Sequence, residues 1–353
     1  DPKAVALAIS LSDEVLRIKS KYHASRIFFK ASQNASIHGF GLINSTALRL
    51  GGIASLFLPK FVLSLVMLRV KQISKEIILS SDKEKLNKHI EKRLRNEATL
   101  NINVLGEAVL GEEEAEQRYS QTIEMMRRKE VNYVSVKISS ICSQIVTVDH
   151  EGTLERVTKK LRELYKVSVE TETFVNLDME EFRDLRLTVD VFKLLLLEKP
   201  FQKLYAGIVL QAYLPEAHEV FEELLLWAKD RKLNYGGKIK IRLVKGANLE
   251  MERVESEIQG WNSATYPKKD LVDASYLRLI DIGLRKEFEG VVDLGIASHN
   301  LFHLSFALEV AKFRKVLNQM DIEMLEGMAN AEALALSSRD KRVLFYTPVA
   351  KDD

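Results

Sequence analysis

The chain of 353 residues has little cysteine and almost no net charge. Its one cysteine, Cys142, cannot form an internal disulfide, which favours a reducing compartment, and we expect this residue to be small, buried and structural. Lys and Arg number 52 against 50 Asp and Glu. A dedicated nucleic-acid binder needs a basic face or stripe, so this balance argues against nucleic acid as a partner.

Several catalytic and targeting signatures are also missing. The sequence has no H-E-x-x-H, paired CxxC or G-x-S-x-G motif, and its histidines lack the spacing of metal ligands, so we expect no metal site. The N-terminus has no basic start followed by an apolar core, so it is not a secretory signal.

No long apolar run is uninterrupted. The most apolar stretch, Leu50 to Val70, carries Pro59 and Lys60 near its middle. A membrane-spanning helix needs about 20 apolar residues with little charge inside. We therefore expect a buried hairpin of two short helices here, while peripheral attachment to a membrane surface stays open.

Two patterns divide the chain. Residues 1–100 have apolar positions at helical spacing with charged outer faces, which predicts an all-helical N-terminal region. From residue 101 to 353, short β-rich apolar runs alternate with longer amphipathic stretches. Such alternation is typical of parallel strands joined by crossover helices.

There are eight such runs. They begin at Asn101, Tyr133, Phe174, Gly207, Ile239, Val291, Ile322 and Val343. Eight units favour a closed, distorted (βα)8 barrel of the TIM type. An open doubly wound sheet would also alternate, but "NVLGEAVLGEEE" after the first run lacks GxGxxG. The widest spacing follows the fifth run, and we expect a long functional loop within residues 248–290.

Polar side chains close nearly every run. In a barrel we expect apolar strand interiors and chemistry at the C-terminal strand ends. The polar residues at these ends are Glu107, Lys137, Asp178, Gln211, Arg242, Lys245, His299, Asn300, Glu326 and Tyr346. Simple strand-to-loop transitions would explain one or two of them, but not the whole set.

Lys137 follows Val134 and Val136 and precedes Ile138, so it needs a carboxylate partner or loses its proton. Asp178 on the next strand is the expected partner. Two mechanisms stay open. Lys137 could be a Schiff-base amine, as in barrel aldolases, or the Lys137–Asp178 pair could position a substrate or cofactor.

Arg242 and Lys245 lie in and just beyond the run "IKIRLV", where buried cations are costly without an anionic partner. Gly246 permits close backbone approach. A phosphate group or a flavin would suit the two cations, and the alternative is a surface ion pair with Glu250 or Glu252. His299 and Asn300 form either a ligand-binding pair or a satisfied strand end.

Together the strand ends resemble the proline dehydrogenase domain of bifunctional bacterial proline utilization A. The resemblance rests on "LNINVLGEAVLGEEEA", "YVSVKISSICSQ", "FVNLDMEEFRDLRLT", "GIVLQAYLPEA", "IRLVKGANLEME", "YPKKDLVDASYLRLI", "IASHN", "IEMLEGMAN" and "LFYTPV", in the family's order. It implies noncovalent FAD, oxidation of L-proline to Δ1-pyrroline-5-carboxylate, and transfer of electrons to a membrane quinone. It also implies a C-terminal aldehyde dehydrogenase domain and a cytoplasmic protein, peripheral on the inner face of the bacterial membrane in some settings.

The resemblance assigns roles to individual positions. Those implied to be catalytic are Lys137, Asp178 and Arg242. Those implied to hold proline are Lys137, Leu325 and Tyr346. The implied cofactor-binding residues are Asp178, Gln211, Arg242, Lys245, Gly246, Ala247, His299 and Asn300. Hydride would pass to flavin N5 beside the Arg242 cation, and a coupled Lys137–Asp178 pair would deprotonate the amine.

Three positions depart from the family pattern. Val272 stands where a threonine is usual, and Asn248 where some members have an aromatic residue. The family's final barrel helix, with a tyrosine and two arginines that hold the proline carboxylate, has no counterpart before Asp353. Two other functions stay open, namely a Schiff-base lyase or aldolase using Lys137 and a noncatalytic scaffold whose working part is residues 1–100.

Overall fold

The structure is a computed structural model that describes residues 10–15, 17–33, 42–95, 98–105, 109, 111–328, 330–340 and 343–350. The chain divides into two compact units, Asp1–Glu76 and Ile77–Asp353. This division lies upstream of residue 100, where the sequence pattern placed the boundary. The short strand β1 (Leu79–Ser80) and helix α6 (Lys83–Arg95) therefore belong to the second unit.

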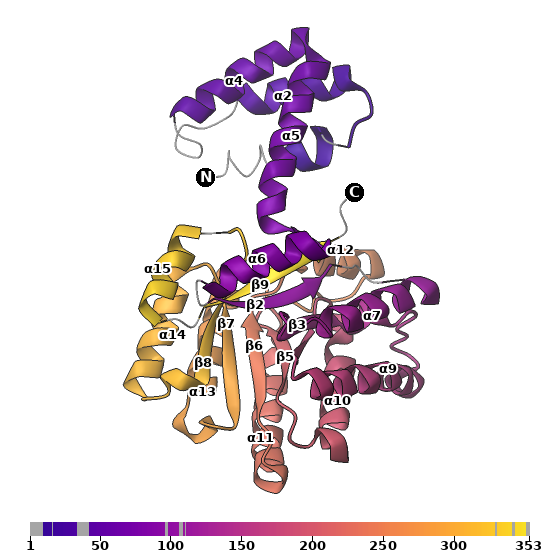
Figure 1. Cartoon of the computed structure of the whole chain (residues 1–353), viewed down its shortest axis with the longest axis vertical. Coiled ribbons are helices and arrows are strands. Elements are labelled where there is room, and N and C mark those ends of the chain that lie inside the picture. Colours follow the sequence, from indigo (N-terminus) through magenta and orange to yellow (C-terminus); the bar gives the residue numbers. More distant parts are fainter. Residues whose placement is uncertain are drawn as a thin grey trace. The chain divides into compact units, whose positions relative to one another are not determined.

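The N-terminal unit is helical, as predicted. It contains a π-helical segment, Ser10–Val15, and helices α2 (Lys21–Gln33), α4 (Leu42–Phe57) and α5 (Pro59–Ile77) (Figure 1). Helix α2 packs against α4. The small core of this unit contains Val15, Ala24, Phe28 and Leu63.

The apolar stretch Leu50 to Val70 is divided between α4 and α5, which meet at Leu58, directly before Pro59. The prediction of two helices is confirmed, but the prediction that they are buried is wrong. Phe57 is 80% exposed and Phe61 is 64% exposed, so this surface is largely apolar. Among the residues the structure describes, no helix is both long and apolar enough to cross a membrane.

The second unit is a closed barrel of parallel strands. Its strands are β2 (Thr99–Val104), β3 (Tyr133–Lys137), β4 (Phe174–Asp178), β5 (Ala206–Gln211), β6 (Ile239–Val244), β7 (Val292–Ala297), β8 (Met320–Leu325) and β9 (Val343–Ala350). Neighbours in sequence pair in order, and β9 pairs with both β2 and β8, which closes the barrel. Each of the eight predicted runs overlaps one of these strands. The short strand β1, which the sequence did not indicate, pairs with the end of β9.

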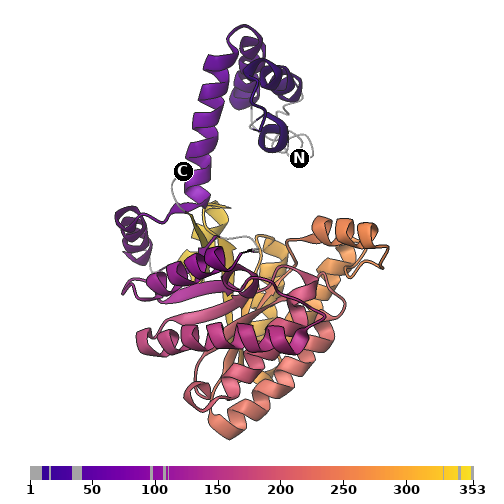
Figure 2. The same cartoon turned by 90° about the vertical axis from the view of Figure 1, so that its right-hand side faces the viewer.

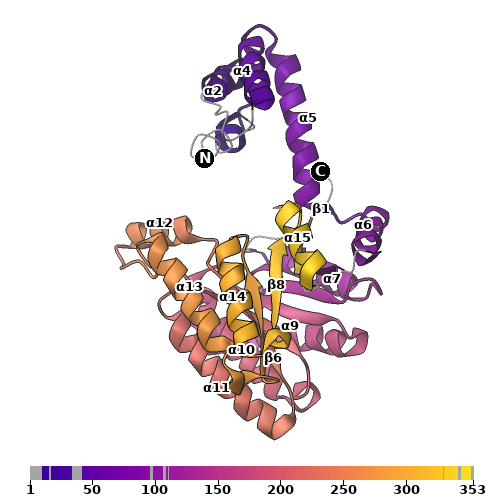
Figure 3. The ribbon, with the colours of Figure 1, turned by 90° about the vertical axis from the view of Figure 1, so that its left-hand side faces the viewer.

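Helices surround this barrel (Figures 1 and 2). They are α7 (Glu112–Met126), α8 (Ile138–Ile141), α9 (His150–Thr171), α10 (Leu185–Leu197), α11 (Ala217–Tyr235), α12 (Leu249–Gln259), α13 (Lys269–Gly283), α14 (Leu301–Phe313) and α15 (Asn330–Asp340). Helix α13 packs on β6, β7 and α14 (Figure 3). Residues 248–290 are thus not one long loop, because α12 and α13 occupy most of them.

The two faces of each strand differ in chemistry. On β6, Ile239, Ile241 and Leu243 are fully buried and belong to the apolar core, whereas Lys240 and Arg242 line cavities at the two ends of the barrel. The expectation of an apolar strand interior is therefore wrong for the lumen. Its polar side chains include Asn101, Ser135, Asn176, Asp178, Lys240, Arg242 and Glu323, all of them buried.

Arg231 of α11 ties several turns of the barrel together. It is 1% exposed, and its guanidinium donates to the main-chain carbonyls of Leu196, Phe201, Leu204 and Lys238 at 2.8–3.2 Å. Buried carbonyl groups that lose their donors destabilise a fold, because water cannot replace the bond. Arg231 therefore holds the loops before β5 and β6 to their helices.

We expect Arg231→Met to lower the free energy of unfolding by about 3 kcal/mol, since it removes the donor from four main-chain carbonyls, two in buried and two in partly buried hydrogen bonds. Urea unfolding followed by circular dichroism measures this loss. Lys232→Met, at the neighbouring exposed position of the same helix, is the control and should cost little. Equal stability of the two variants would contradict the anchoring role of Arg231.

Candidate active site at the C-terminal ends of the strands

A cavity of about 480 Å³ opens at the C-terminal ends of the barrel strands. Its lining includes Lys137, Asp178, Arg242, Lys245, Gly246, Ala247, His299, Asn300, Leu325 and Tyr346. These are all of the site residues predicted from the sequence except Gln211. The volume is within the range of sites for small molecules and cofactors, about 300–1,000 Å³.

Asp178, at the end of β4, is the centre of a hydrogen-bond network. Its Oδ1 accepts from Ser135 Oγ at 3.0 Å and from Asn176 Nδ2 at 2.7 Å, and Arg242 Nη1 lies 3.4 Å away. Its Oδ2 accepts from the hydroxyl of Tyr346 at 2.7 Å. Burial and the neighbouring Asp178 raise the pKa of Tyr346 well above its usual value, so this phenol remains a donor.

Arg242 lies between two carboxylates. Its Nε is 2.8 Å from Glu323 Oε2, and its guanidinium carbon lies 4.3 Å from the ring centroid of Tyr346. Burial alone would lower the pKa of Arg242, but Glu323 and Asp178 raise it above its ordinary value. The alternative of a surface ion pair with Glu250 or Glu252 is therefore wrong for Arg242.

Lys137 has a different partner from the one predicted. Its amine forms an ion pair with Glu180, two residues beyond Asp178. Lys137 and Asp178 are direct neighbours in the register of β3 and β4, yet no ion pair joins them among the described residues. The reason is that Ser135, Asn176, Arg242 and Tyr346 already surround the Asp178 carboxylate.

Lys245 also pairs outside the predicted set. Its Nζ lies 2.6 Å from Asp273 Oδ1 of α13, so its partner is neither Glu250 nor Glu252. Gly246 has φ +122°, and a Cβ there would lie 2.4 Å from the Tyr213 ring. Both observations require glycine at this position, and the main chain here runs close against Tyr213 at the cavity wall.

His299 and Asn300, which also line the cavity, differ in their hydrogen bonds. The Nε2 of His299 accepts from the main-chain N–H of Leu325 at 3.2 Å, which places the ring proton on Nδ1. Burial lowers the pKa of His299, and its buried Nδ1 has no partner within the described part of the chain. Asn300 caps α14 by accepting from Phe302 N–H at 2.9 Å.

Three predicted strand-end residues lie elsewhere. Gln211 does not line the cavity. Its amide donates at 2.8 Å to the main-chain carbonyl of Glu180, which does line the cavity. Glu326 is bound by Arg93 and lies 3.5 Å from His89 of α6. Glu107 lies outside the described residues.

Sequence reasoning missed the acidic residues Glu180 and Glu323. A signal for Glu323 was present, because Asp321 and Glu323 alternate with apolar residues in "MDIEML" just as Lys240 and Arg242 do in "IKIRLV". Acidic and basic pairs with a period of two on strands of one barrel predict charges that meet in its lumen.

The donor set suits a flavin. Arg242 and Lys245 are cations at one wall, and the buried Nδ1–H of His299 is an unused donor within the described residues. No group of three or more metal-ligating side chains is found in the described residues.

A family model named proline dehydrogenase matches residues 86–353, which is most of the chain. The chain belongs to the proline dehydrogenase family. This match begins within α6 and includes every strand of the barrel. The resemblance stated from the sequence is thus confirmed.

Relatives and solved structures agree with this membership. The bifunctional protein PutA of Klebsiella aerogenes is 25% identical over 201 residues, which cover 55% of this chain and 15% of that protein. A rat hydroxyproline dehydrogenase is 33% identical over 92 residues, 26% of this chain and 19% of that protein. The chain therefore spans only a small part of the curated relatives it matches.

Among solved structures, proline utilization A (PutA) from Corynebacterium freiburgense is 44% identical, with a TM-score of 0.77 over 80% of this chain and 30% of that chain. PutA from Bdellovibrio bacteriovorus inactivated by N-propargylglycine has a TM-score of 0.81 over 100% of this chain and 36% of that one. At 24% identity, the second likeness shows the fold alone. The predicted barrel with a helical N-terminal region is confirmed.

Carboxylates gather beside the cavity, directly after β4. Asp184 is 5% exposed, and burial, together with Glu181, raises its pKa to about 6. Glu252 of α12 accepts from the main-chain N–H of Phe182 at 2.7 Å. In the segment after β4, the Glu252 carboxylate thus holds the main chain by a hydrogen bond, whereas ionisation of the buried Asp184 destabilises the folded state.

We expect Asp184→Asn to stabilise the protein above pH 6 by about 2 kcal/mol and to have little effect at pH 4. The folded state holds the Asp184 proton that the unfolded chain releases near pH 4, so native stability falls as the pH rises from about 4 to 6. Urea unfolding at several pH values measures the difference. Asp230→Asn, at an exposed position of α11, is the control, and a pH-independent effect of Asp184→Asn would contradict the prediction.

Proposed function

We propose that this chain is an FAD-dependent proline dehydrogenase that oxidises L-proline to Δ1-pyrroline-5-carboxylate, the first step of proline catabolism to glutamate. The observation that carries the proposal is Arg242, fixed between Glu323 and Asp178 at the floor of the cavity beside Tyr346. Membership of the proline dehydrogenase family supports the substrate.

FAD, when bound, supplies the acceptor for the hydride that proline loses from the carbon next to its nitrogen. Arg242 and Lys245 present positive charge to the anionic groups of the cofactor, and Gly246 and Ala247 line the same cavity. The ionic partners of both cations, Glu323, Asp178 and Asp273, hold them in place before any ligand arrives. Such preorganised charge needs no rearrangement during the reaction.

Leu325 and Tyr346 offer apolar surface to the proline ring, and both line the cavity. The hydroxyl of Tyr346 is engaged by Asp178, so its ring is fixed rather than free to rotate. The amine of proline must be unprotonated when the hydride leaves. We place the group that receives this proton at Glu180, the ionic partner of Lys137, instead of at the predicted Lys137–Asp178 pair, because the Asp178 carboxylate already has four partners.

The other partners remain proposals of the same kind. A quinone of the membrane would accept the electrons, and an aldehyde dehydrogenase domain would consume the product. Support for the second comes from relatives named bifunctional, of which this chain covers 15%. A cytoplasmic location with peripheral attachment to the membrane would bring the quinone within reach.

The Schiff-base alternative loses support from the position of Lys137. Its amine is engaged in an ion pair with Glu180, so it is not free to add to a carbonyl group. Borohydride reduction in the presence of a carbonyl substrate would leave Lys137 unmodified under the proposed function.

We expect the purified chain to bind FAD and to show a visible flavin spectrum that bleaches on addition of L-proline but not of D-proline, because a chiral cavity positions one enantiomer for hydride loss. An absorption scan under anaerobic conditions makes this measurement. A chain that remains colourless after incubation with FAD would refute the proposed function.

Arg242→Lys keeps the charge but loses the planar group that contacts two carboxylates and a ring, so we expect the rate of flavin bleaching by L-proline to fall at least about tenfold. Arg253→Lys, the same substitution on α12 outside the cavity lining, is the control and should leave the rate unchanged. Stopped-flow absorbance compares the two variants, and equal rates would remove Arg242 from the proposed site.

A further inference from the structure

A line of alternating charge runs through the barrel lumen from one end to the other. Lys240 Nζ lies 2.8 Å from Asp321 Oδ2 and 2.8 Å from Glu323 Oε1. Glu323 Oε2 lies 2.8 Å from Arg242 Nε, and Arg242 Nη1 lies 3.4 Å from Asp178. Glu323 is 1% exposed and is thus a carboxylate shared between two buried cations.

Glu323 reaches these cations across an intervening strand. Strand β7 lies between β6 and β8, and its Gly295 pairs with Arg242 on one side and Asp321 on the other. A Cβ at Gly295 would lie 2.1 Å from Glu323 Oε1 and 3.1 Å from the Lys240 side chain. Because Gly295 of β7 has no side chain, there is space at this position for the Glu323 carboxylate to contact both Lys240 and Arg242.

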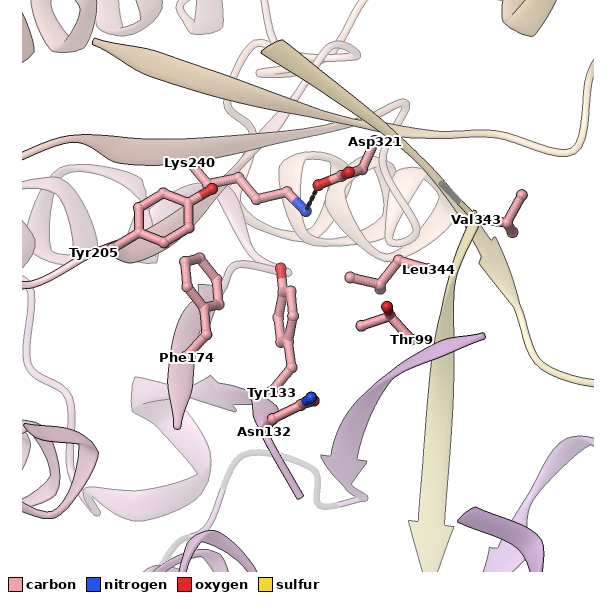
Figure 4. Close-up of a pocket in the computed structure, with 9 residues that line it drawn as sticks. All are labelled: Thr99, Asn132, Tyr133, Phe174, Tyr205, Lys240, Asp321, Val343 and Leu344. Atoms are coloured by element: carbon pink, nitrogen blue, oxygen red, sulfur yellow. Dashed lines mark hydrogen bonds and ion pairs between the residues drawn. The ribbon is translucent and has the colours of Figure 1, made fainter. Parts of the chain in front are cut away.

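At the N-terminal ends of the strands, the line of charges is surrounded by the protein's own aromatic and acidic side chains. A cavity of about 330 Å³ at the N-terminal ends of the strands is lined by Tyr133, Tyr205, Lys240 and Asp321, among others (Figure 4). The Lys240 amine points between Asp321 and the aromatic rings, 5.3 Å from the Tyr133 centroid (Figure 4). Lys240 thus lies between Asp321 and Glu323 and contacts both carboxylates.

We propose that Glu323 is a positioning residue for the reaction: it fixes the Arg242 guanidinium in the lining of the cavity that would hold the cofactor, with Lys240 and Gly295 keeping its carboxylate in place. This inference rests on the proposed function. Two contacts at different nitrogens, Nε to Glu323 and Nη1 to Asp178, define an orientation that one contact cannot. The contact with Asp178 is a hydrogen bond, whereas Glu323 is an ionic partner 2.8 Å from Nε, so the loss of Glu323 would leave the guanidinium with one charged contact.

The test uses substitutions that separate orientation from charge balance. Glu323→Gln removes the anion but keeps its shape, and Lys240→Met combined with Glu323→Gln removes one cation and one anion together. Asp321→Asn is the matched control, because it makes the same carboxylate-to-amide change two residues away, on a group that contacts Lys240 and not Arg242.

Titration of each purified protein with FAD is the first readout. We expect Glu323→Gln and the charge-balanced double variant both to bind FAD at least about tenfold more weakly than the native chain, since each loses the carboxylate charge beside Arg242 Nε. Asp321→Asn should bind within about twofold of the native chain. Native affinity in the double variant would show that Glu323 only balances charge, and would overturn the proposal.

A second readout does not depend on flavin. Urea unfolding of the cofactor-free chain is compared for Glu323→Gln, Arg242→Lys and the two combined. If Glu323 orients Arg242, the combined change in the unfolding equilibrium constant should differ at least about fivefold from the product of the single changes. Additive effects would overturn the positioning role. A native chain that binds no FAD but shows this coupling would instead count against the proposed function alone.

Discussion

The burial of Arg242 inside a barrel is the constraint on which the rest of the site depends. A guanidinium taken out of water is stable only when carboxylates and hydrogen bonds replace its hydration. Glu323 and Asp178 do so here, and each requires partners of its own: Lys240 for Glu323, and Ser135, Asn176 and Tyr346 for Asp178. One buried cation thus determines the chemistry of strands β3, β4, β8 and β9.

The same network explains which parts of the fold could be predicted from the sequence. The outward faces of the strands pack on helices, so their apolar residues recur in short runs, and all eight runs were found. The polar lumen was not anticipated, because alternation along one strand does not show which strand supplies the partner. Glu323 contacts Arg242 across β7 only because Gly295 carries no side chain. The register of the strands decides that Gly295 lies at this position, and the sequence alone does not show the register.

Lys137 shows the limit most clearly. The sequence placed it correctly opposite Asp178 at neighbouring strand ends, and both line one cavity. The partner predicted for Lys137 was nevertheless wrong. Proximity does not decide an ion pair when other donors already surround the carboxylate. Asp178 is occupied by Tyr346 and Arg242, so the amine turns to Glu180, just beyond the strand. In the N-terminal unit, helix periodicity was sufficient to predict α4 and α5 but not the exposure of Phe57 and Phe61.

The two ends of the lumen have different tasks although the same strands build them. At the N-terminal end, Lys238 lies over the Tyr205 ring and Lys240 over the Tyr133 ring, so the chain's own cations occupy the surfaces that a ligand would need. At the C-terminal end, Arg242 and Lys245 are oriented by carboxylates, while the cavity in front of them stays open. Because Glu323 contacts one cation of each layer, it joins the cations at the N-terminal end of the lumen to those at the C-terminal end.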